Sequence, residues 1–470
     1  MAVSALSLGM ANASEYLIKS TDKSVEKFLK SRAVSMERFE TIPWAKITIN
    51  DKLTEQEVIL KLRKSGVVLQ PNYAIHLLEN YRMGEKELNY LLARYWDNPE
   101  REEWNEMKAV SADNPPIPAP ENPSETGSDP LLTRQWGMND IGVKEAWKET
   151  MGSRDMVVAV IDTGVDYTHE DLKANLWRNE GELADNGIDD DGNGYVDDVV
   201  GWDFAKNDNK PYDMTTSVWE MVFSGGNPGH GTHCAGNVAA RGNNGKGIAG
   251  VAPNVKIMAL RFLTEKGQGT TADAIKAIEY AIRNGAKVLS NSWGSEGEDP
   301  SEGQENQALR DIIKRVGDDG ILFVAAAGNG HSGVGYDNDS DAKPGYPASY
   351  DHENIISVAA IDVENKLGSF SNWGKQSVDL AAPGVKVFST IPGNGYSDTV
   401  LSFLGMKVYW DGTSMATPHV AGAAALYWSK YPEKSWAEVK SAIMLSVKSV
   451  VGFENKLVTG GKLDVATLLQ

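Results

Sequence analysis

Five short, nearly continuous apolar runs in the last three quarters of the chain constrain its fold most strongly. Longer segments with helical spacing of apolar residues lie between or after them, at Thr271–Asn284, Glu305–Val316 and Thr417–Tyr431. A strand that is apolar at every position is buried on both faces, which is typical of a parallel sheet covered by helices. We therefore predict an α/β fold with a doubly wound, mostly parallel sheet over residues 131–470. The runs are Met156–Ile161, Val255–Arg261, Ala286–Asn291, Gly320–Ala326 and Asn354–Ala360.

The residues before this domain divide into two regions. Residues 14–80 alternate short strand and helix patterns, which predicts a small α+β open-faced sandwich whose last strand is Val67–Leu78. Residues 81–130 comprise a charged helical stretch followed by a linker, 111–130, that is rich in proline and polar residues. Such a composition favours an extended chain over a packed element.

The extreme N-terminus indicates export. Ala2–Met10 is a short apolar run, and Ala11-Asn12-Ala13 fits the small-x-small pattern of signal-peptide cleavage. We interpret residues 1–13 as the remnant of a signal peptide and expect a secreted or periplasmic protein. A disordered apolar tail is the alternative.

Composition excludes several classes of protein. The formal charge is −19, and all of it lies after residue 110, because residues 1–110 carry 16 basic and 16 acidic side chains. This charge argues against nucleic acid or anionic lipid as the main partner. No uninterrupted apolar stretch approaches ~18 residues, so we expect no membrane span. With one cysteine, Cys234, a disulfide within the chain is impossible.

Three segments place a reactive side chain beside glycine or other small residues. Asp162 follows the apolar run that ends at Ile161, at the carboxyl edge of the predicted sheet, where open α/β sheets bind ligands. His230 lies between two glycines at the start of a predicted helix, so a substrate can approach closely. Ser414 comes just before the predicted helix that contains Pro418, and a helix N-terminus favours a developing negative charge. Taken singly, each residue also suits an ordinary structural role.

Together the three residues occur in the order Asp, His, Ser, and each borders the predicted sheet. In this the chain resembles the subtilisin-like serine protease family, the subtilases. The resemblance rests on Asp162 in IDTG, His230 in HGTH and Ser414 in GTSMATPHVAG. It covers residues 131–470, and residues 14–80 resemble the family's propeptide. It implies a secreted serine endopeptidase, made as a self-processing zymogen, that hydrolyses peptide bonds through an acyl-enzyme intermediate.

The chemistry assigns a role to each member of this triad. A serine hydroxyl is a poor nucleophile at neutral pH, so His230 is expected to take its proton from Ser414. Asp162 is expected to orient the imidazole and stabilise its charged form. An apolar strand ends in Gly-Asn at Asn329, and the resemblance implies that this amide donates to the oxyanion together with the N–H of Ser414. No organic cofactor is expected.

The substrate is expected to bind as an extended strand, because main-chain pairing does not require one particular sequence. The resemblance assigns two edges to this strand, although ordinary Gly-rich loops are the alternative. Trp293 on the second edge is expected to line apolar pockets. The edges are Gly267, Gln268 and Gly269 on one side and Ser292, Trp293 and Gly294 on the other.

Residues 186–198 read NGIDDDGNGYVDD, with oxygen-bearing groups at alternate positions and a glycine that permits a turn. Such spacing is typical of a structural calcium loop, although the closing Glu of an EF-hand is missing. A solvated acidic turn is the alternative. A second calcium site at Asp171, near the Asn243-Asn244 loop, is implied by the resemblance only. The expected ligands of the first site are Asp189, Asp191, Asn193, the Tyr195 carbonyl and Asp197.

The resemblance also implies that residues 14–80 cap the cleft as an intramolecular inhibitor. In that register the first cut falls near Leu77–Leu78, and the linker 111–130 offers a second cutting site. The expected partners are protein or peptide substrates and the chain's own propeptide, and the enzyme is expected to be a monomer.

Other interpretations remain open at this stage. One is a catalytically silent binding or scaffold protein on the same fold. Another is an esterase, although its serine would lie in G-x-S-x-G and not in G-T-S-M-A. Lys210–Phe223 looks like an insertion, and its Trp219, Met221 and Phe223 either cover the cleft or pack on the core. His233 is interpreted as a buried structural histidine.

Overall fold

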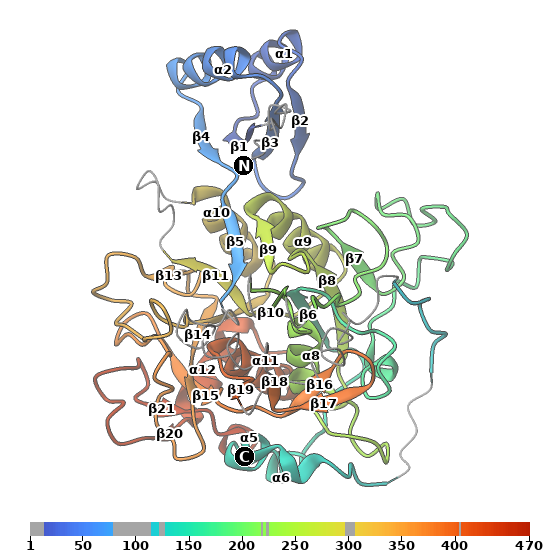
Figure 1. The fold of residues 1–470 in the computed structure, drawn as a ribbon, viewed down its shortest axis with the longest axis vertical. Coiled ribbons are helices and arrows are strands. Elements are labelled where there is room, and N and C mark those ends of the chain that lie inside the picture. The colour runs from blue at the N-terminus through green and yellow to red at the C-terminus, as the bar shows by residue number, and fades with distance from the viewer. Residues whose placement is uncertain are drawn as a thin grey trace, which may run out of the picture.

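A computed structural model describes residues 14–78, 114–121, 127–217, 220–221, 225–296, 306–403 and 406–470. A small N-terminal module, residues 14–78, stands on a larger main domain, residues 127–470, and one strand runs from the module down into the main domain (Figure 1). The predicted signal-peptide remnant at 1–13 and the predicted helical stretch at 81–110 lie outside the described residues.

The main domain is built on a nine-stranded sheet, and its strands pair in parallel except for the edge strand β20. This confirms the predicted doubly wound, mostly parallel sheet. The five predicted apolar runs are five of its strands, within one or two residues at most of their ends. In spatial order the strands are β20 (Lys448–Ser449), β21 (Gly461–Lys462), β15 (Leu380–Pro383), β14 (Ile355–Ile361), β12 (Leu322–Ala326), β10 (Val288–Asn291), β6 (Val157–Asp162), β8 (Lys256–Arg261) and β7 (Gly201–Asp203).

Helices and hairpins complete the main domain. Hairpins β16–β17 (Ser389–Ile391, Gly395–Ser397) and β18–β19 (Thr399–Phe403, Met406–Tyr409) lie close before the Ser414 motif in the sequence. Short 3₁₀ turns span Leu132–Arg134 and Lys173–Asn175. The helices are α5 (Trp136–Asp140), α6 (Val143–Ala146), α8 (His230–Ala239), α9 (Thr271–Arg283), α10 (Gln307–Asp318), α11 (Thr413–Lys430), α12 (Trp436–Ser446) and α13 (Val465–Leu468).

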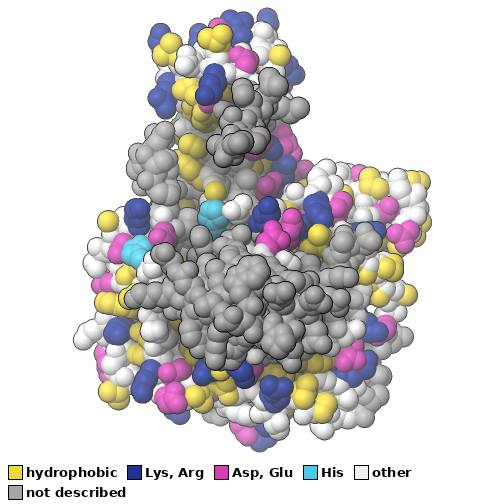
Figure 2. Space-filling view, in the orientation of Figure 1, with side chains coloured by type: hydrophobic (Ala, Val, Ile, Leu, Met, Phe, Trp, Pro, Cys, Tyr) yellow, Lys and Arg dark blue, Asp and Glu magenta, His cyan; other side chains and the backbone are white. Residues whose placement is uncertain are grey.

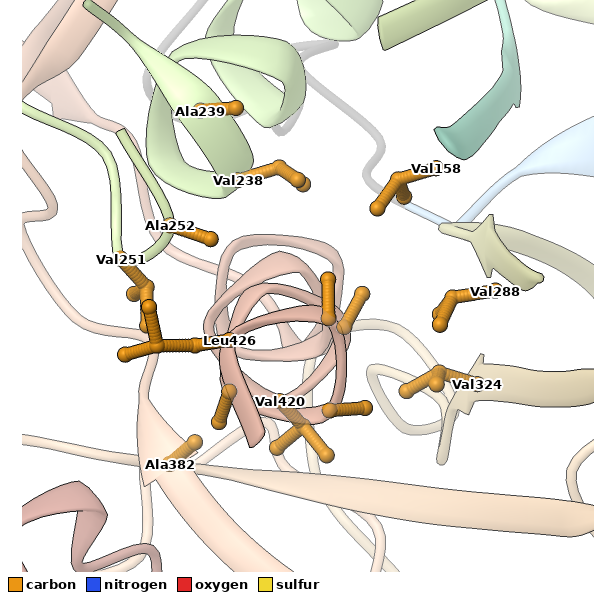
Figure 3. Close-up of a cluster of buried hydrophobic side chains, with 14 of the residues drawn as sticks. Val158, Val238, Ala239, Val251, Ala252, Val288, Val324, Ala382, Val420 and Leu426 are labelled. Atoms are coloured by element: carbon orange, nitrogen blue, oxygen red, sulfur yellow. The ribbon is translucent and has the colours of Figure 1, made fainter. Parts of the chain in front are cut away.

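Apolar cores cover both faces of the sheet, which is why its strands are apolar at every position. Along β6, Val158 and Val160 belong to one core, whereas Val157, Ala159 and Ile161 belong to the other. Figure 3 shows the first core, in which α11 and α8 pack against β6, β10 and β12. The second core lies under α9 and α10.

The central helix α11 begins four residues earlier than predicted, at Thr413, so Ser414 lies inside its first turn. The prediction was wrong because Pro418 was taken as a first-turn residue. A proline at that position has no N–H to donate to the carbonyl four residues back, that of Ser414. Other donors use this carbonyl: the Ser292 hydroxyl at 3.0 Å and the Cys234 thiol at 3.5 Å. Because of Pro418, the Ser414 carbonyl is hydrogen-bonded to Ser292 and Cys234 from outside the helix.

The N-terminal module has its own four-stranded antiparallel sheet, in the order β2-β3-β1-β4, covered by two helices and filled by a separate apolar core. Asp51 caps the second helix by accepting the N–H of Thr54 at 2.9 Å. The outer face of the module carries many Lys and Arg side chains (Figure 2). Its elements are β1 (Ser14–Lys19), α1 (Lys23–Ser31), β2 (Ser35–Arg38), β3 (Trp44–Ile49), α2 (Lys52–Lys64) and β4 (Val68–Pro71).

The predicted last strand, Val67–Leu78, is two strands in two different sheets. Pro71 ends β4, because proline cannot donate to a further ladder bond. After it, β5 (Ala74–Leu77) leaves the module and lies between β11 (Trp293–Glu296) and β9 (Gln268–Thr270) of the main domain (Figure 1). A short strand, β13 (Gly345–Tyr346), completes this second four-stranded sheet.

The segment 114–121 of the predicted linker forms no helix or strand, and it is packed against the main domain, which a free linker would not be. The Tyr167 hydroxyl donates to the Pro115 carbonyl at 2.8 Å, and the Arg178 guanidinium donates to that of Pro118. Ile117 joins a small apolar cluster around Tyr167. Within the described part of the chain, no helix has both the length and the apolar character needed to cross a membrane.

Candidate active site

Two of the predicted catalytic residues are joined directly. Asp162 ends β6, His230 begins α8, and the Asp162 Oδ1 atom lies 2.7 Å from His230 Nδ1. Both side chains are buried. The close approach requires glycine at position 231, because a Cβ there would lie 2.0 Å from the Gly164 carbonyl oxygen. A proton on Nδ1, shared with the carboxylate, leaves Nε2 as the basic nitrogen of the ring.

Ser414 lies beside this pair. The Cys234 sulfur is 3.9 Å from His230 Nδ1 and 3.5 Å from the Ser414 carbonyl oxygen, so one small side chain touches both residues. The Ser414 hydroxyl donates to the Ser292 carbonyl at 3.1 Å, and the Ser292 hydroxyl donates back to the Ser414 carbonyl. The serine at the helix start is thereby held against the strand edge that begins at Ser292.

Asn329 is fixed next to the same helix start. Its Oδ1 atom accepts the N–H and the hydroxyl of Thr413, both at 2.8 Å. These two bonds turn the oxygen of the amide toward Thr413 and its nitrogen to the opposite side. The Thr413 hydroxyl also accepts the N–H of Gly328 at 3.2 Å, which ties the loop after β12 to α11.

Two neighbouring side chains are chemically silent. Burial raises the pKa of the Cys234 thiol to about 11, so this thiol stays protonated and does not compete as a nucleophile. Burial lowers the pKa of His233 to about 3, and its ring stacks on Trp410 at 4.1 Å between centroids. His233 therefore occupies a structural position, and its Nε2 lies 3.0 Å from the Val387 carbonyl.

The two predicted substrate edges flank β5. Leu77 pairs with Trp293 and His76 with Gly294 on one side, while His76 pairs with Gln268 and Ile75 with Gly269 on the other. The N–H of Leu77 donates to the Gly267 carbonyl at 2.9 Å. On the other edge, glycine at position 294 lets β5 and β13 lie close to β11. A Cβ at this position would lie 2.3 Å from the Tyr346 carbonyl oxygen and 3.2 Å from the Leu78 side chain.

The structure describes Trp293 and one of the three large apolar residues of the predicted insertion. The Trp293 ring is buried, with its centroid 5.0 Å from that of Phe262, in the apolar cluster that also contains Ile75. It therefore lies in the wall of the cleft behind β5.

Met221 of the insertion is buried in the core, whereas Trp219 and Phe223 lie outside the described residues.

The acidic loop brings two of the predicted ligands close to a third carboxylate that was not predicted. One carboxylate oxygen from each of Glu182, Asp189 and Asp191 lies within 4.8 Å of the others. Asp197 accepts the N–H groups of Asn186 and Gly187 at 3.0 and 2.9 Å, and Asp189 likewise accepts those of Asn193 and Gly194. Asn193 Oδ1 accepts the N–H of Tyr195, whose ring packs 4.9 Å from Trp202.

The second predicted metal position is lined by two buried carboxylates. Asp171 accepts the Asn244 amide at 2.7 Å and the N–H of Ile248 at 2.9 Å. Asp129 accepts the N–H groups of Asn243 and Asn244. Burial raises the pKa of both acids. The sequence analysis did not single out Glu182, which lies before the alternating pattern, or Asp129, which lies in the Pro-rich segment that was interpreted as a linker.

A parallel α/β domain that presents a buried Asp–His pair, a serine on a helix start and two strand-binding edges has the architecture of a subtilisin-like serine protease. Comparison with known proteins agrees. The model of the subtilase family matches residues 153–461, so the chain belongs to the subtilase family. The resemblance inferred from the three motifs is confirmed.

Individual relatives give the extent of the similarity. A thermophilic serine proteinase from Bacillus sp. (strain AK1) is 37% identical over 318 residues, which cover 68% of this chain and 63% of that protein. Thermitase from Thermoactinomyces vulgaris is 35% identical over 328 residues, covering 70% of this chain and 93% of thermitase. The chain is also similar to the crystal structure of fervidolysin from Fervidobacterium pennivorans, a keratinolytic enzyme related to subtilisin. This similarity covers 99% of this chain and 62% of fervidolysin, with a TM-score of 0.67 and 25% sequence identity.

Proposed function

We propose that the protein is a secreted serine endopeptidase that hydrolyses peptide bonds through Ser414, His230 and Asp162. His230 takes the hydroxyl proton as Ser414 attacks the carbonyl carbon, and it later protonates the leaving amine. Asp162 holds the ring through Nδ1 and stabilises the imidazolium that forms. The acyl group on Ser414 is then released by water, with His230 again acting as the base.

The tetrahedral intermediate carries a negative oxygen that needs preorganised donors. The amide nitrogen of Asn329 and the backbone N–H of Ser414 are the proposed donors, because Ser414 lies in the first turn of α11 and Asn329 is hydrogen-bonded to Thr413 beside it. The two bonds from Thr413 to Asn329 Oδ1 keep this amide oriented before the substrate arrives. Donors that are fixed in advance spend no free energy on reorganisation during the reaction.

One observation carries the proposal: a strand of the chain's own module, β5, lies between the two predicted substrate edges. Leu77 pairs with Trp293, so the same antiparallel register places Leu78 opposite Ser292. The Ser292 carbonyl accepts the hydroxyl of Ser414. We therefore propose that the peptide bond after Leu78 is the one that Ser414 attacks.

The rest of the module docks on α9 and α10, which supports its role as an intramolecular inhibitor. Asp311 accepts the Lys19 ammonium and the Trp44 indole N–H, both at 2.7 Å. Glu279 accepts the N–H and hydroxyl of Thr41 at 2.6 and 2.8 Å. The Gln70 amide oxygen accepts the Ala308 N–H at the start of α10. These contacts hold β5 in the cleft even after its end is cut.

Maturation is expected to begin with a cut between Leu78 and Glu79. Active enzyme should lack residues 14–78, because that module blocks both substrate edges. N-terminal sequencing of active enzyme checks the position, and a chromogenic peptide ending in Ile-His-Leu-Leu checks the activity. The segment 114–121 is packed on the main domain, so we expect any second cut outside it.

Two outcomes would contradict this proposal. Full activity with the module still covalently attached and docked would remove its inhibitory role. Absence of both peptide hydrolysis and fluorophosphonate labelling in the processed chain would favour a silent binding protein on the subtilase fold. A control peptide with glycine at the last position is expected to be cleaved poorly, since Leu78 lies against Gly294 and supplies apolar contact.

We further propose a structural calcium ion at the acidic loop, held by Glu182, Asp189 and Asp191. Three converging carboxylates fit a hard cation that prefers oxygen ligands. The ion would neutralise a local excess of negative charge and fix the loop. Asn193, the Tyr195 carbonyl and Asp197, which follow at alternate positions in the same loop, are proposed as the remaining oxygen ligands.

Removing calcium is expected to lower Tm before it affects the chemistry of the triad. An ion that binds only the folded state stabilises it by about 2.7 kcal/mol at a free concentration one hundred times Kd. The corresponding loss is several degrees in Tm, measured by calorimetry with and without chelator. Asp191→Asn should reduce the difference, whereas Asp185→Asn, an exposed acid in the same loop, should preserve it. Equal Tm values in calcium and in chelator would argue against the site.

A further inference from the structure

Asp213, a carboxylate outside the triad, is hydrogen-bonded to residues that adjoin both Asp162 and His230. Asp213 lies in the segment before His230 and is completely buried, with no cation bound to it among the ion pairs of the described residues. Its Oδ1 atom accepts the Thr163 hydroxyl at 2.8 Å and the Asn227 amide at 2.6 Å. Its Oδ2 atom accepts the N–H and the hydroxyl of Thr232 at 2.8 and 2.7 Å.

Each of these partners adjoins a catalytic residue. Thr163 follows Asp162 in the chain, and its hydroxyl accepts the N–H of Gly231 at 2.9 Å. Asn227 accepts the backbone N–H of His230 at 2.8 Å. Thr232 lies two residues after His230, in the first turn of α8. One carboxylate thus holds the end of β6 and the start of α8 at a fixed separation.

We infer that Asp213 is a positioning residue for the Asp162–His230 pair, a role that rests on the proposed peptidase function. Four donors converge on it, and two of them, the Thr232 N–H and the Asn227 amide, cannot act as acceptors. A neutral amide at this position loses at least one of these bonds, because its nitrogen cannot accept. The imidazole would then shift relative to Ser414 while the cleft that binds substrate keeps its shape.

The backbone around Asp213 is held independently of its carboxylate. The N–H of Val165 donates to the Pro211 carbonyl at 2.9 Å, and the N–H of Thr216 donates to the Asn227 carbonyl at 3.0 Å. A Cβ on Gly164 would lie 2.7 Å from the Pro211 oxygen. A change confined to the side chain of Asp213 therefore leaves a framework that supports the fold. Burial raises the pKa of Asp213 to about 6, so at pH 8 it is an acceptor only.

The test is a kinetic comparison of Asp213→Asn with wild type at pH 8, with active sites counted by fluorophosphonate. We expect kcat per active site to fall about tenfold to a hundredfold, with KM changed less than twofold, since small misplacements of catalytic groups cost rates of this order. Thr163→Val should lower kcat in the same way, and Thr163→Ser, which keeps the hydroxyl, should restore most of it.

A matched control distinguishes positioning from general destabilisation. Asp379 is a largely buried acid directly before β15 that accepts the N–H of Ser357 in β14 at 2.8 Å and lies 3.7 Å from the Lys440 ammonium. The strands β12 and β10 separate β14 from β6 in the sheet. Asp379→Asn is expected to lower Tm without changing kcat per active site. Unchanged kcat in both Asp213→Asn and Thr163→Val, or a loss confined to KM, would overturn the inference. An inactive wild-type enzyme would instead refute the proposed function.

Discussion

Replacing Ser414 by alanine is expected to lower turnover by about 10⁶-fold, the cost measured for the nucleophile of a subtilisin. The hydroxyl oxygen forms the acyl bond, and no neighbouring group replaces it, because the Cys234 thiol stays protonated. The variant should also accumulate as a precursor with residues 14–78 attached. A chromogenic peptide and fluorophosphonate labelling measure the loss of activity, and gel analysis measures the accumulated precursor.

The fold of this variant should be preserved. The Ser414 hydroxyl donates one bond, to the Ser292 carbonyl, and loss of such a neutral bond costs about 1 kcal/mol. Ser357→Ala, at an equally buried serine in β14, is the control and should process normally. Normal processing of the Ser414→Ala chain, expressed without wild-type enzyme, would contradict the self-cleavage proposal. Retained hydrolysis would assign the chemistry to another residue.

The second large effect is expected at Asn329. Asn329→Leu should lower kcat about 10²- to 10³-fold with little change in KM, as for loss of the equivalent donor in a subtilisin. This corresponds to roughly 2.7–4 kcal/mol of transition-state stabilisation. The reason is that the proposed bond from the amide to the oxyanion gains most of its strength in the transition state, when the negative charge develops on that oxygen. Steady-state kinetics on the same peptide measure both constants.

Asn329 also anchors the start of α11, so a control must separate the two roles. Thr413→Val removes the hydroxyl bond to Asn329 Oδ1 and the acceptor of the Gly328 N–H, but it keeps the backbone bond and the amide donor. A small loss of kcat is expected for this variant. If Thr413→Val costs as much as Asn329→Leu, the effect belongs to the anchored turn and not to oxyanion stabilisation.

Local sequence patterns determined much of the main domain. Continuous apolar runs predict buried parallel strands because both faces of such strands meet a core, and β6, β8, β10, β12 and β14 follow them closely. The residues Asp162, His230 and Ser414 were recognisable because each motif combines a reactive side chain with the small residues that let backbones approach. The ends of the helices were predicted less accurately. The start of α11, for example, depends on hydrogen bonds from Ser292 and Cys234, which lie far away in the sequence.

Only the tertiary structure decided which distant groups converge. The alternating acids of residues 189–197 predicted a ligand set, but they gave no sign that the fold also brings Glu182 to Asp189 and Asp191. Asp213 carried no signal at all, because its partners lie 14 to 50 residues away in the chain. The separation of β5 from β4 likewise depends on pairing with β9 and β11. A sequence records local preferences of the backbone, whereas a buried carboxylate acquires its role from whichever donors the packed core places around it.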